Sequence, residues 1–124
     1  HALMGLTVVA HRPEDFARWT RTRAARERRE AEMAGEGAAL FQSSGCAACH
    51  RIAGTDANGL AGPDLTFIGA RRTIGAGILP HNRGTLMGWI ANSQAIKPNN
   101  RMPPYPNLSG EELQAIATYL EAQR

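Results

Sequence analysis

Apolar residues recur at helical spacing near the end of the chain, at Leu113, Ile116, Ala117 and Leu120. Residues three and four apart share one face of an α-helix, so this stripe predicts a helix with one buried face. Ser109 and Glu112 precede the stripe at the spacing of a capping box, in which each side chain accepts a hydrogen bond from the backbone of the other residue. We therefore expect the last helix to begin directly after Ser109.

Two shorter segments also carry helix signals. One helix is expected from residue 36 to about residue 43, where Gly37 and Phe41 lie four apart and share a face. Because a glycine permits close approach, this face is expected to cross the apolar stripe of the last helix. Another short helix is expected around residues 85–92. The loops between them are rich in Gly and Pro, and little strand signal appears after residue 10, so this part of the chain is predicted to be all-α.

The N-terminal residues follow a different pattern. Residues 6–10 are an apolar, β-branched run that is typical of a short strand. Pro13 and the two acidic residues after it are helix start signals, because proline fits the first turn and acids favour the helix N-terminus. We therefore predict a strand and a linker helix within residues 1–34, and a separate domain over residues 35–124.

Composition narrows the classes of function. The 124 residues suit one small domain, and 43% hydrophobic with 20% charged residues excludes a disordered chain. No apolar run approaches the roughly 20 residues of a membrane helix. Arginines alternate with acidic residues in the linker, which indicates a solvated helix, so no nucleic-acid partner is expected. The chain has only two Trp, two Tyr and three Phe, so few large aromatic side chains are available to fill a core. A large buried cofactor would explain why so few are needed.

The two cysteines carry the strongest chemical signal. Cys46, Cys49 and His50 have the C-x-x-C-H spacing of a site for covalent haem c attachment. Two thiols at this spacing can each form a thioether to one haem vinyl group, and the next residue then carries its imidazole under the iron. A redox dithiol would follow a strand, and a zinc site would need two more ligands, which the scattered His11 and His81 do not supply. The motif therefore predicts one covalent haem c.

The second axial ligand of the iron is expected on a stiff, non-helical segment further along the chain. Met102 fits, because the two prolines after it force an extended backbone. Met87 lies in a helix-like run and suits the core better, although Met87, His81 or an open site remain alternatives. We predict His50 and Met102 as the iron ligands, and a neutral thioether raises the reduction potential relative to a second imidazole.

The order of these features resembles a class I cytochrome c: a helix, Cys46–His50, a loop with Gly62-Pro63-Asp64-Leu65, then Trp89, Met102 and a closing helix. The resemblance implies an all-α class I cytochrome c fold around one covalent haem c, with the short N-terminal strand and linker helix appended. It also implies that the Pro63 carbonyl accepts a hydrogen bond from His50 Nδ1–H, which fixes the imidazole tautomer. Arg71 and Trp89 would hydrogen-bond a haem propionate.

A closer resemblance covers the whole chain. Residues 62–66, 69–71, 73–80, 89–90 and 94–98 are similar to the cytochrome c domain fused to subunit II of caa3-type cytochrome c oxidases. His1 and Met4, which have two residues between them and precede the apolar run, resemble the last two ligands of the dinuclear copper centre in the preceding cupredoxin domain. The cysteine ligands of that domain are absent from this sequence. His1 and Met4 would therefore be remnants that hold no copper here, and copper would belong to the parent subunit only.

The resemblance implies an electron-transfer domain without substrate chemistry of its own. Electrons would come from a soluble donor, a cytochrome c or an iron–sulfur protein, and leave for the copper centre of the parent oxidase, which reduces oxygen and pumps protons. The copper domain and the other oxidase subunits would be its partners. Membrane anchors in the missing N-terminal part of the parent would hold the domain, soluble as this fragment, on the extracytoplasmic (periplasmic) face.

Two alternatives to this function remain open. One is a freestanding or dehydrogenase-fused c-type cytochrome. The other belongs to a different class, a haem peroxidase or gas sensor in which Met102 does not bind the iron and the distal site is open.

Overall fold

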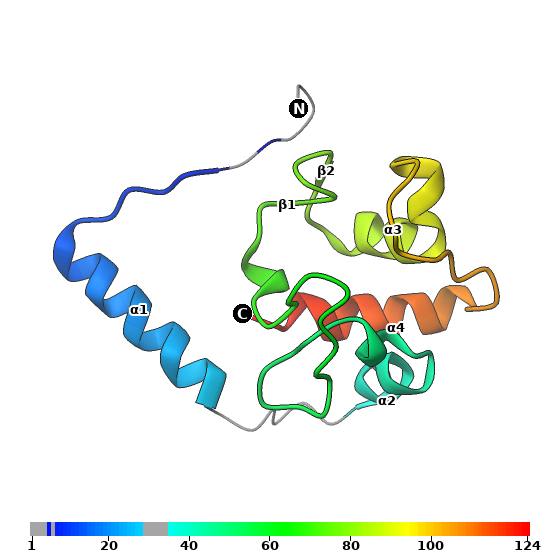
Figure 1. Ribbon diagram of the computed structural model, residues 1–124, viewed down its shortest axis with the longest axis horizontal. Coiled ribbons are helices and arrows are strands. Elements are labelled where there is room, and N and C mark those ends of the chain that lie inside the picture. Colours follow the sequence, from blue (N-terminus) through cyan, green and yellow to red (C-terminus); the bar gives the residue numbers. More distant parts are fainter. Residues whose placement is uncertain (1–4, 6, 29–34) are drawn as a thin grey trace.

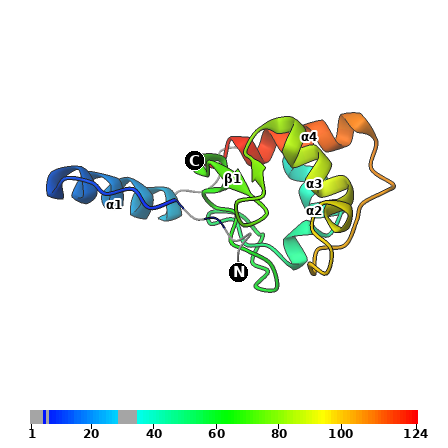
Figure 2. The same cartoon turned by 90° about the horizontal axis from the view of Figure 1, so that it is seen from above.

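The structure, a computed structural model, describes residues 5, 7–28 and 35–124. It contains the helices α1 (Pro13–Arg28), α2 (Glu36–Ser43), α3 (Arg83–Ile96) and α4 (Gly110–Glu121), the short 3-10 helices η1 (Cys46–Ala48) and η2 (Ile68–Ala70), and the strands β1 (Thr73–Ile74) and β2 (Leu79–Pro80). Helices α2, α3 and α4 pack together with the loops between them, and α1 lies to one side (Figures 1 and 2). The predicted, mostly helical fold is confirmed.

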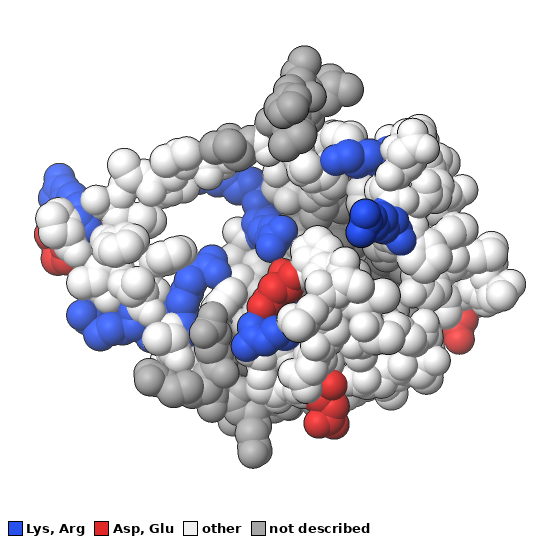
Figure 3. Space-filling model, in the orientation of Figure 1, with Lys and Arg blue, Asp and Glu red and all other residues white. Residues whose placement is uncertain are grey.

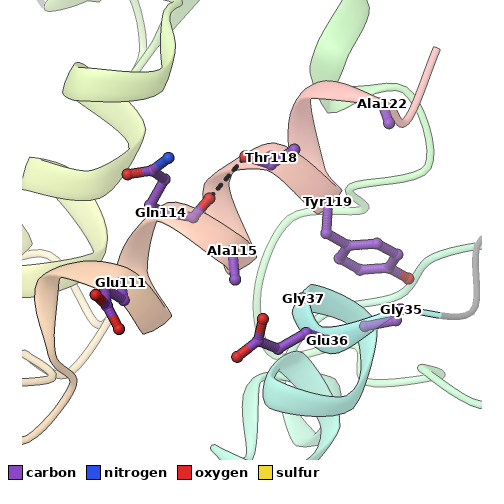
Figure 4. Close-up of a pocket in the computed structure, with 10 residues that line it drawn as sticks. Gly35, Glu36, Gly37, Glu111, Gln114, Ala115, Thr118, Tyr119 and Ala122 are labelled. Carbon is purple, nitrogen blue, oxygen red and sulfur yellow. Dashed lines mark hydrogen bonds between the residues drawn. The ribbon is translucent and has the colours of Figure 1, made fainter.

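Helices α2 and α4 cross where α2 carries a glycine. A Cβ on the buried Gly37 would lie 2.2 Å from the Ala115 carbonyl oxygen and 2.8 Å from Tyr119 Cβ, so only glycine fits here. Figure 4 shows this crossing, beside a groove of about 610 Å³. One turn further along α2, the Phe41 ring lies against the Tyr119 ring with their centroids 5.7 Å apart. The predicted crossing of these two helices is therefore present.

Capping boxes start both α3 and α4. Ser109 N–H donates to Glu112 Oε2 at 2.8 Å and Glu112 N–H donates to Ser109 Oγ at 3.2 Å, as the sequence predicts. Asn82 and Thr85 form the same arrangement ahead of α3. Helix α3 extends beyond the predicted residues 85–92 because its backbone resumes helical geometry after a break at Asn92, where φ is −157° and ψ is 77°.

The hairpin of β1 and β2 was not expected. Its two residue pairs are Thr73 with Pro80 and Ile74 with Leu79. The turn between the strands places Gly75, Ala76 and Gly77 in the left-handed region, at φ of 63°, 65° and 92°. Strands of two residues are too short to produce an alternating pattern, which explains why the sequence gives no signal for them.

The predicted strand over residues 6–10 is not formed by residues 7–10, and Leu6 lies outside the described residues. A strand requires a neighbouring strand for its ladder of hydrogen bonds, and none lies beside residues 7–10 in the described part of the chain. The segment instead touches the hairpin turn, where Gly5 N–H donates to the Ala76 carbonyl at 3.0 Å. An extended apolar run is present, but its sheet is not.

Helix α1 begins at Pro13 as predicted and folds back on the rest of the chain. The guanidinium carbon of Arg23 lies 4.7 Å from the ring centroid of Trp19 and 4.0 Å from that of Phe67, so a cation–π contact joins α1 to the loop before η2.

Basic and acidic side chains are interspersed on the face of the molecule in Figure 3. Neither α1 nor any helix within residues 35–124 combines the length and apolarity of a membrane span.

One hydrophobic core joins the helices to the cysteine segment. Its buried members come from every helix after residue 35 and from β1, and they include Cys46, which is 6% exposed. Half-buried side chains pack around this core, among them Met87, Trp89, Met102 and Tyr105. Cys46, Met102 and Trp89, three of the residues predicted to hold a haem, therefore share one packing unit with the α2–α4 crossing.

The α2–α4 crossing makes a testable prediction. Gly37→Ala should lower the free energy of unfolding by about 1–3 kcal/mol, because the added methyl group meets backbone atoms that cannot move aside independently. Gly88→Ala is the matched control, since Gly88 lies in α3 with no atom within 4 Å of an added Cβ. That change should gain about 0.5–1 kcal/mol from helix propensity. Denaturant unfolding measures both, and a Gly37→Ala protein as stable as the parent would contradict the crossing.

Candidate haem-binding site

The C-x-x-C-H segment forms a compact turn directly after α2. Gly45 ends the helix in the left-handed region, at φ 77°. The backbone N–H groups of Cys49 and His50 then both donate to the Cys46 carbonyl, at 3.1 and 3.0 Å. Both thiols are free, with Cys46 buried and Cys49 exposed. The turn thus presents one thiol in the core and the other at the surface.

The imidazole of His50 is held in one orientation. Its Nδ1 lies 2.8 Å from the Pro63 carbonyl oxygen, as the resemblance predicts. A carbonyl only accepts hydrogen bonds, so Nδ1 carries the proton and Nε2 keeps its lone pair for a metal. The ring also packs against the backbone at Gly62, where a Cβ would lie 2.5 Å from His50 Cε1. Hydrogen bond and packing together fix the imidazole with Nε2 as the free nitrogen.

The loop that carries Pro63 is tied to the same turn. Gly62 N–H donates to the Cys49 carbonyl at 2.7 Å, and the Arg51 guanidinium pairs with the Asp64 carboxylate. Burial alone would raise the pKa of Asp64, but the hydrogen bonds from Thr66 and the pairing with Arg51 outweigh it and hold that pKa below its usual value. Contacts on both sides of Pro63 therefore keep its carbonyl in place.

The surroundings of Cys46 do not activate its thiol as a nucleophile. Burial raises the pKa of Cys46, and a hydrogen bond with Tyr105 offsets only part of that effect. A reactive dithiol needs a lowered thiol pKa, since the thiolate is the nucleophile. Burial and the neighbouring Cys46 likewise raise the pKa of Tyr105. Tyr105 links the segment after Met102 to the cysteine turn, a contact that the sequence pattern did not reveal.

The remaining predicted residues fall into three groups. Met102 and Trp89 are half-buried on the core that contains Cys46, and the Trp89 ring lies against the hairpin turn at Gly75. Arg71 is exposed and donates to the Asp64 backbone carbonyl at 3.2 Å, beside Pro63. Met102 and Trp89 thus share the core with Cys46, whereas Arg71 lies at the surface beside the Pro63 loop. His1 and Met4 lie outside the described residues.

The two alternative iron ligands also have defined surroundings. Met87 packs against the core from α3. His81 follows β2, and its Nε2 is buried without a hydrogen-bond partner in the described part of the chain.

The residues present fit a haem c. The site offers two thiols at attachment spacing, an imidazole with Nε2 free, and a thioether on the same core, which are the donors that such a group uses. Over residues 7–28 and 35–124, no three His, Cys, Asp or Glu side chains gather as ligands of a single metal ion.

The sequence profile of the family described as cytochrome c matches residues 34–123 of this chain. The chain belongs to the cytochrome c family. Membership of this family implies a covalently attached haem c.

Three similar proteins share the name cytochrome c oxidase subunit 2. The one from Alkalihalophilus pseudofirmus is 34% identical over 98% of this chain. Those from Bacillus subtilis and Bacillus sp. strain PS3 are 31% and 33% identical over 98% and 97% of it. The cytochrome c chain spans 35% of the length of each relative.

The ion pair of the Pro63 loop predicts a pH dependence. Asp64→Asn should lower the free energy of unfolding by less than about 1 kcal/mol at neutral pH, because the pair is partly exposed. Since the folded-state pKa of Asp64 is lowered, its contribution is present above the unfolded pKa and is lost as the pH falls through the folded one. The difference between the two proteins should therefore shrink below about pH 4. Urea unfolding at several pH values measures this, and a difference that grows on acidification would contradict it.

Proposed function

We propose that this cytochrome c domain is an electron carrier that binds one haem c through thioethers at Cys46 and Cys49, with His50 and Met102 as the iron ligands. The observation that carries the proposal is the 2.8 Å contact between His50 Nδ1 and the Pro63 carbonyl. It leaves Nε2 available directly beside the two thiols. When bound, the haem supplies a one-electron redox couple.

The residues of the chain have separate tasks in this proposal. His50, held by Pro63, supplies a neutral imidazole of fixed tautomer. Met102 would supply a neutral thioether as the second iron ligand, which would leave no position at the iron for a substrate. Cys49 is exposed while Cys46 is buried, so electrons enter and leave at the surface on the Cys49 side.

Arg71 and Trp89 are proposed to bind a haem propionate. Arg71 supports this role through its exposed guanidinium, which lies next to the Pro63 loop. Trp89 supports it through its half-buried position on the core around the cysteine turn.

A second, more specific proposal concerns the pathway of the electrons. We infer that the domain accepts them from a soluble cytochrome c or iron–sulfur protein and passes them to the dinuclear copper centre of a haem-copper oxygen reductase. Proteins named cytochrome c oxidase subunit 2 match 97–98% of the length of this chain at 31–34% identity. This match over nearly the whole chain supports the proposed pathway over a freestanding or dehydrogenase-fused cytochrome. Oxygen reduction and proton pumping would belong to the parent, as would copper, with His1 and Met4 as remnant ligands.

The location and domain division follow from the same proposal. The domain would lie on the extracytoplasmic (periplasmic) face, held there by membrane anchors elsewhere in the parent and close to the copper domain and other oxidase subunits. Residues 35–124 would be the cytochrome domain, and residues 1–34 the end of the copper domain with a linker helix. This boundary is supported by the family match, which begins at residue 34, and by the extended backbone of Gly35 at φ −176° and ψ 172°.

The iron ligands are tested by substitution in the haem-loaded protein. Mass spectrometry of the denatured chain should first show one covalent haem; the mass of the bare polypeptide after acid–acetone extraction would contradict the proposal. The ferric protein should then show the weak far-red charge-transfer band of sulfur bound to iron. Met102→Ala should abolish this band and let the ferrous iron bind carbon monoxide, because the axial position is then free.

Met87→Ala is the matched control, since Met87 also packs on the core but is not proposed to bind the iron. It should leave the band and the carbon monoxide response unchanged. Loss of the band in Met87→Ala would assign the ligand to Met87 instead. If the unsubstituted protein itself binds carbon monoxide, the peroxidase or gas-sensor alternative is favoured.

The electron pathway is tested by stopped-flow mixing. The reduced domain, mixed with an oxidised, separately prepared dinuclear copper domain of an oxidase subunit II, should lose its reduced haem spectrum in one rapid phase. The rate should rise with the concentration of the copper domain, because the step is a bimolecular transfer. A copper domain without copper is the control. Absence of oxidation by the copper-loaded domain would contradict the proposed transfer of electrons to the dinuclear copper centre.

A further inference from the structure

We propose that Ser93, Gln94 and Asn100 form a clamp that holds Met102 in place as an iron ligand. This inference rests on the proposed function, because it concerns the same site. It adds three positioning residues, none of which binds the iron, that fix the backbone on both sides of the ligand.

Both backbone polar groups of Met102 bond to side chains of the clamp. The Met102 carbonyl lies 3.1 Å from Ser93 Oγ and 2.9 Å from Gln94 Nε2, and Met102 N–H donates to Asn100 Oδ1 at 2.8 Å. Fixing the two peptide groups around a residue fixes the direction of its Cα–Cβ bond. The clamp therefore determines the direction in which the Met102 side chain leaves the backbone.

The three side chains of the clamp also bond to one another and to neighbouring backbone carbonyls. The amide nitrogen of Gln94 has two protons and faces two carbonyls, that of Asn100 at 2.7 Å and that of Met102 at 2.9 Å. Asn100 uses both ends of its side chain, since Nδ2 donates to the Lys97 carbonyl at 2.7 Å while Oδ1 accepts from Met102. Ser93 Oγ lies 3.1 Å from Asn100 Oδ1 as well, and Ser93 is 0% exposed. Side-chain and backbone hydrogen bonds therefore connect all three residues of the clamp around the buried Ser93.

The clamp attaches the Met102 loop to the last turns of α3. Ser93 and Gln94 directly follow the break in that helix at Asn92, and the loop reverses direction at Asn99, where φ is 66°. Beyond the prolines, Tyr105 N–H donates to the Ala91 carbonyl at 3.0 Å. The loop is thus held against α3 before and after Met102, and its stiffness does not depend on the prolines alone.

A clamp of this kind governs how often the thioether leaves the iron. A foreign ligand binds the ferric iron only while Met102 is displaced, so its rate of binding at saturating concentration reports the opening of the loop. Removing a donor leaves the Met102 carbonyl short of a partner in the closed state, which favours the open state. The clamp therefore predicts faster ligand replacement in variants that lack its donors.

The experiment measures the rate at which saturating imidazole abolishes the far-red band of the ferric, haem-loaded protein. Ser93→Ala and Gln94→Leu should each raise this rate roughly three- to tenfold, the factor expected for one lost hydrogen bond. The matched controls are Ser43→Ala and Gln42→Leu, the same two substitutions at exposed positions at the end of α2. They should leave the rate equal to that of the unsubstituted protein.

General destabilisation is separated from the clamp by Ile116→Val, which trims a side chain 1% exposed in the core. Clamp variants should exchange ligand faster than Ile116→Val at the same loss of thermal stability. Equal rates at equal stability, or parent-like rates in both Ser93→Ala and Gln94→Leu, would overturn the clamp.

The Met102→Ala protein distinguishes this failure from failure of the proposed ligand. If its far-red band persists, Met102 is not the ligand and the clamp falls with that assignment. If its band is lost while the clamp variants exchange at the parent rate, the ligand assignment stands and only the clamp is wrong.

Discussion

The hydrogen bond between His50 and the Pro63 carbonyl is the constraint on which the site depends. A neutral imidazole has one proton for two nitrogens, and an acceptor at Nδ1 leaves Nε2 as the nitrogen that can bind a metal. The carbonyl can do this only if its loop stays close to the cysteine turn. Three features keep this loop close to the cysteine turn: the hydrogen bond from Gly62 N–H to the Cys49 carbonyl, the Arg51–Asp64 ion pair, and the absence of a side chain on Gly62, which lets the backbone approach the His50 ring.

Helix α4 connects the two sides of the proposed haem site. The cysteine turn follows directly from α2, and the Met102 loop is hydrogen-bonded to α3. Both α2 and α3 pack on α4, the first through the close contact at Gly37. The two proposed iron ligands therefore belong to separate segments whose relative position is set by packing on a third. This is how a short chain with few aromatic residues can hold two ligands in register.

Local signals in the sequence were sufficient where the interaction is local. The Ser109 capping box and the spacing of Cys46, Cys49 and His50 involve residues within four positions of each other, and both were found. The role of Pro63 came from the order of motifs in a known family. The hairpin was missed because two-residue strands carry no periodicity, and the strand over residues 6–10 was wrong for residues 7–10 because strand propensity does not supply a partner. Ser93 and Gln94 gave no signal, since polar residues on a helix usually face solvent, and only the path of the returning loop gives them partners.

The unequal burial of the two cysteines constrains the order of events in biosynthesis. Cys46 is 6% exposed and packs among the core residues, so little of it can be reached from solvent in the folded domain. In the proposed attachment, a haem vinyl group would therefore reach this thiol more readily before the core has packed around it. The exposed Cys49 carries no such restriction. The unequal burial thus favours attachment at Cys46 before the domain has finished folding.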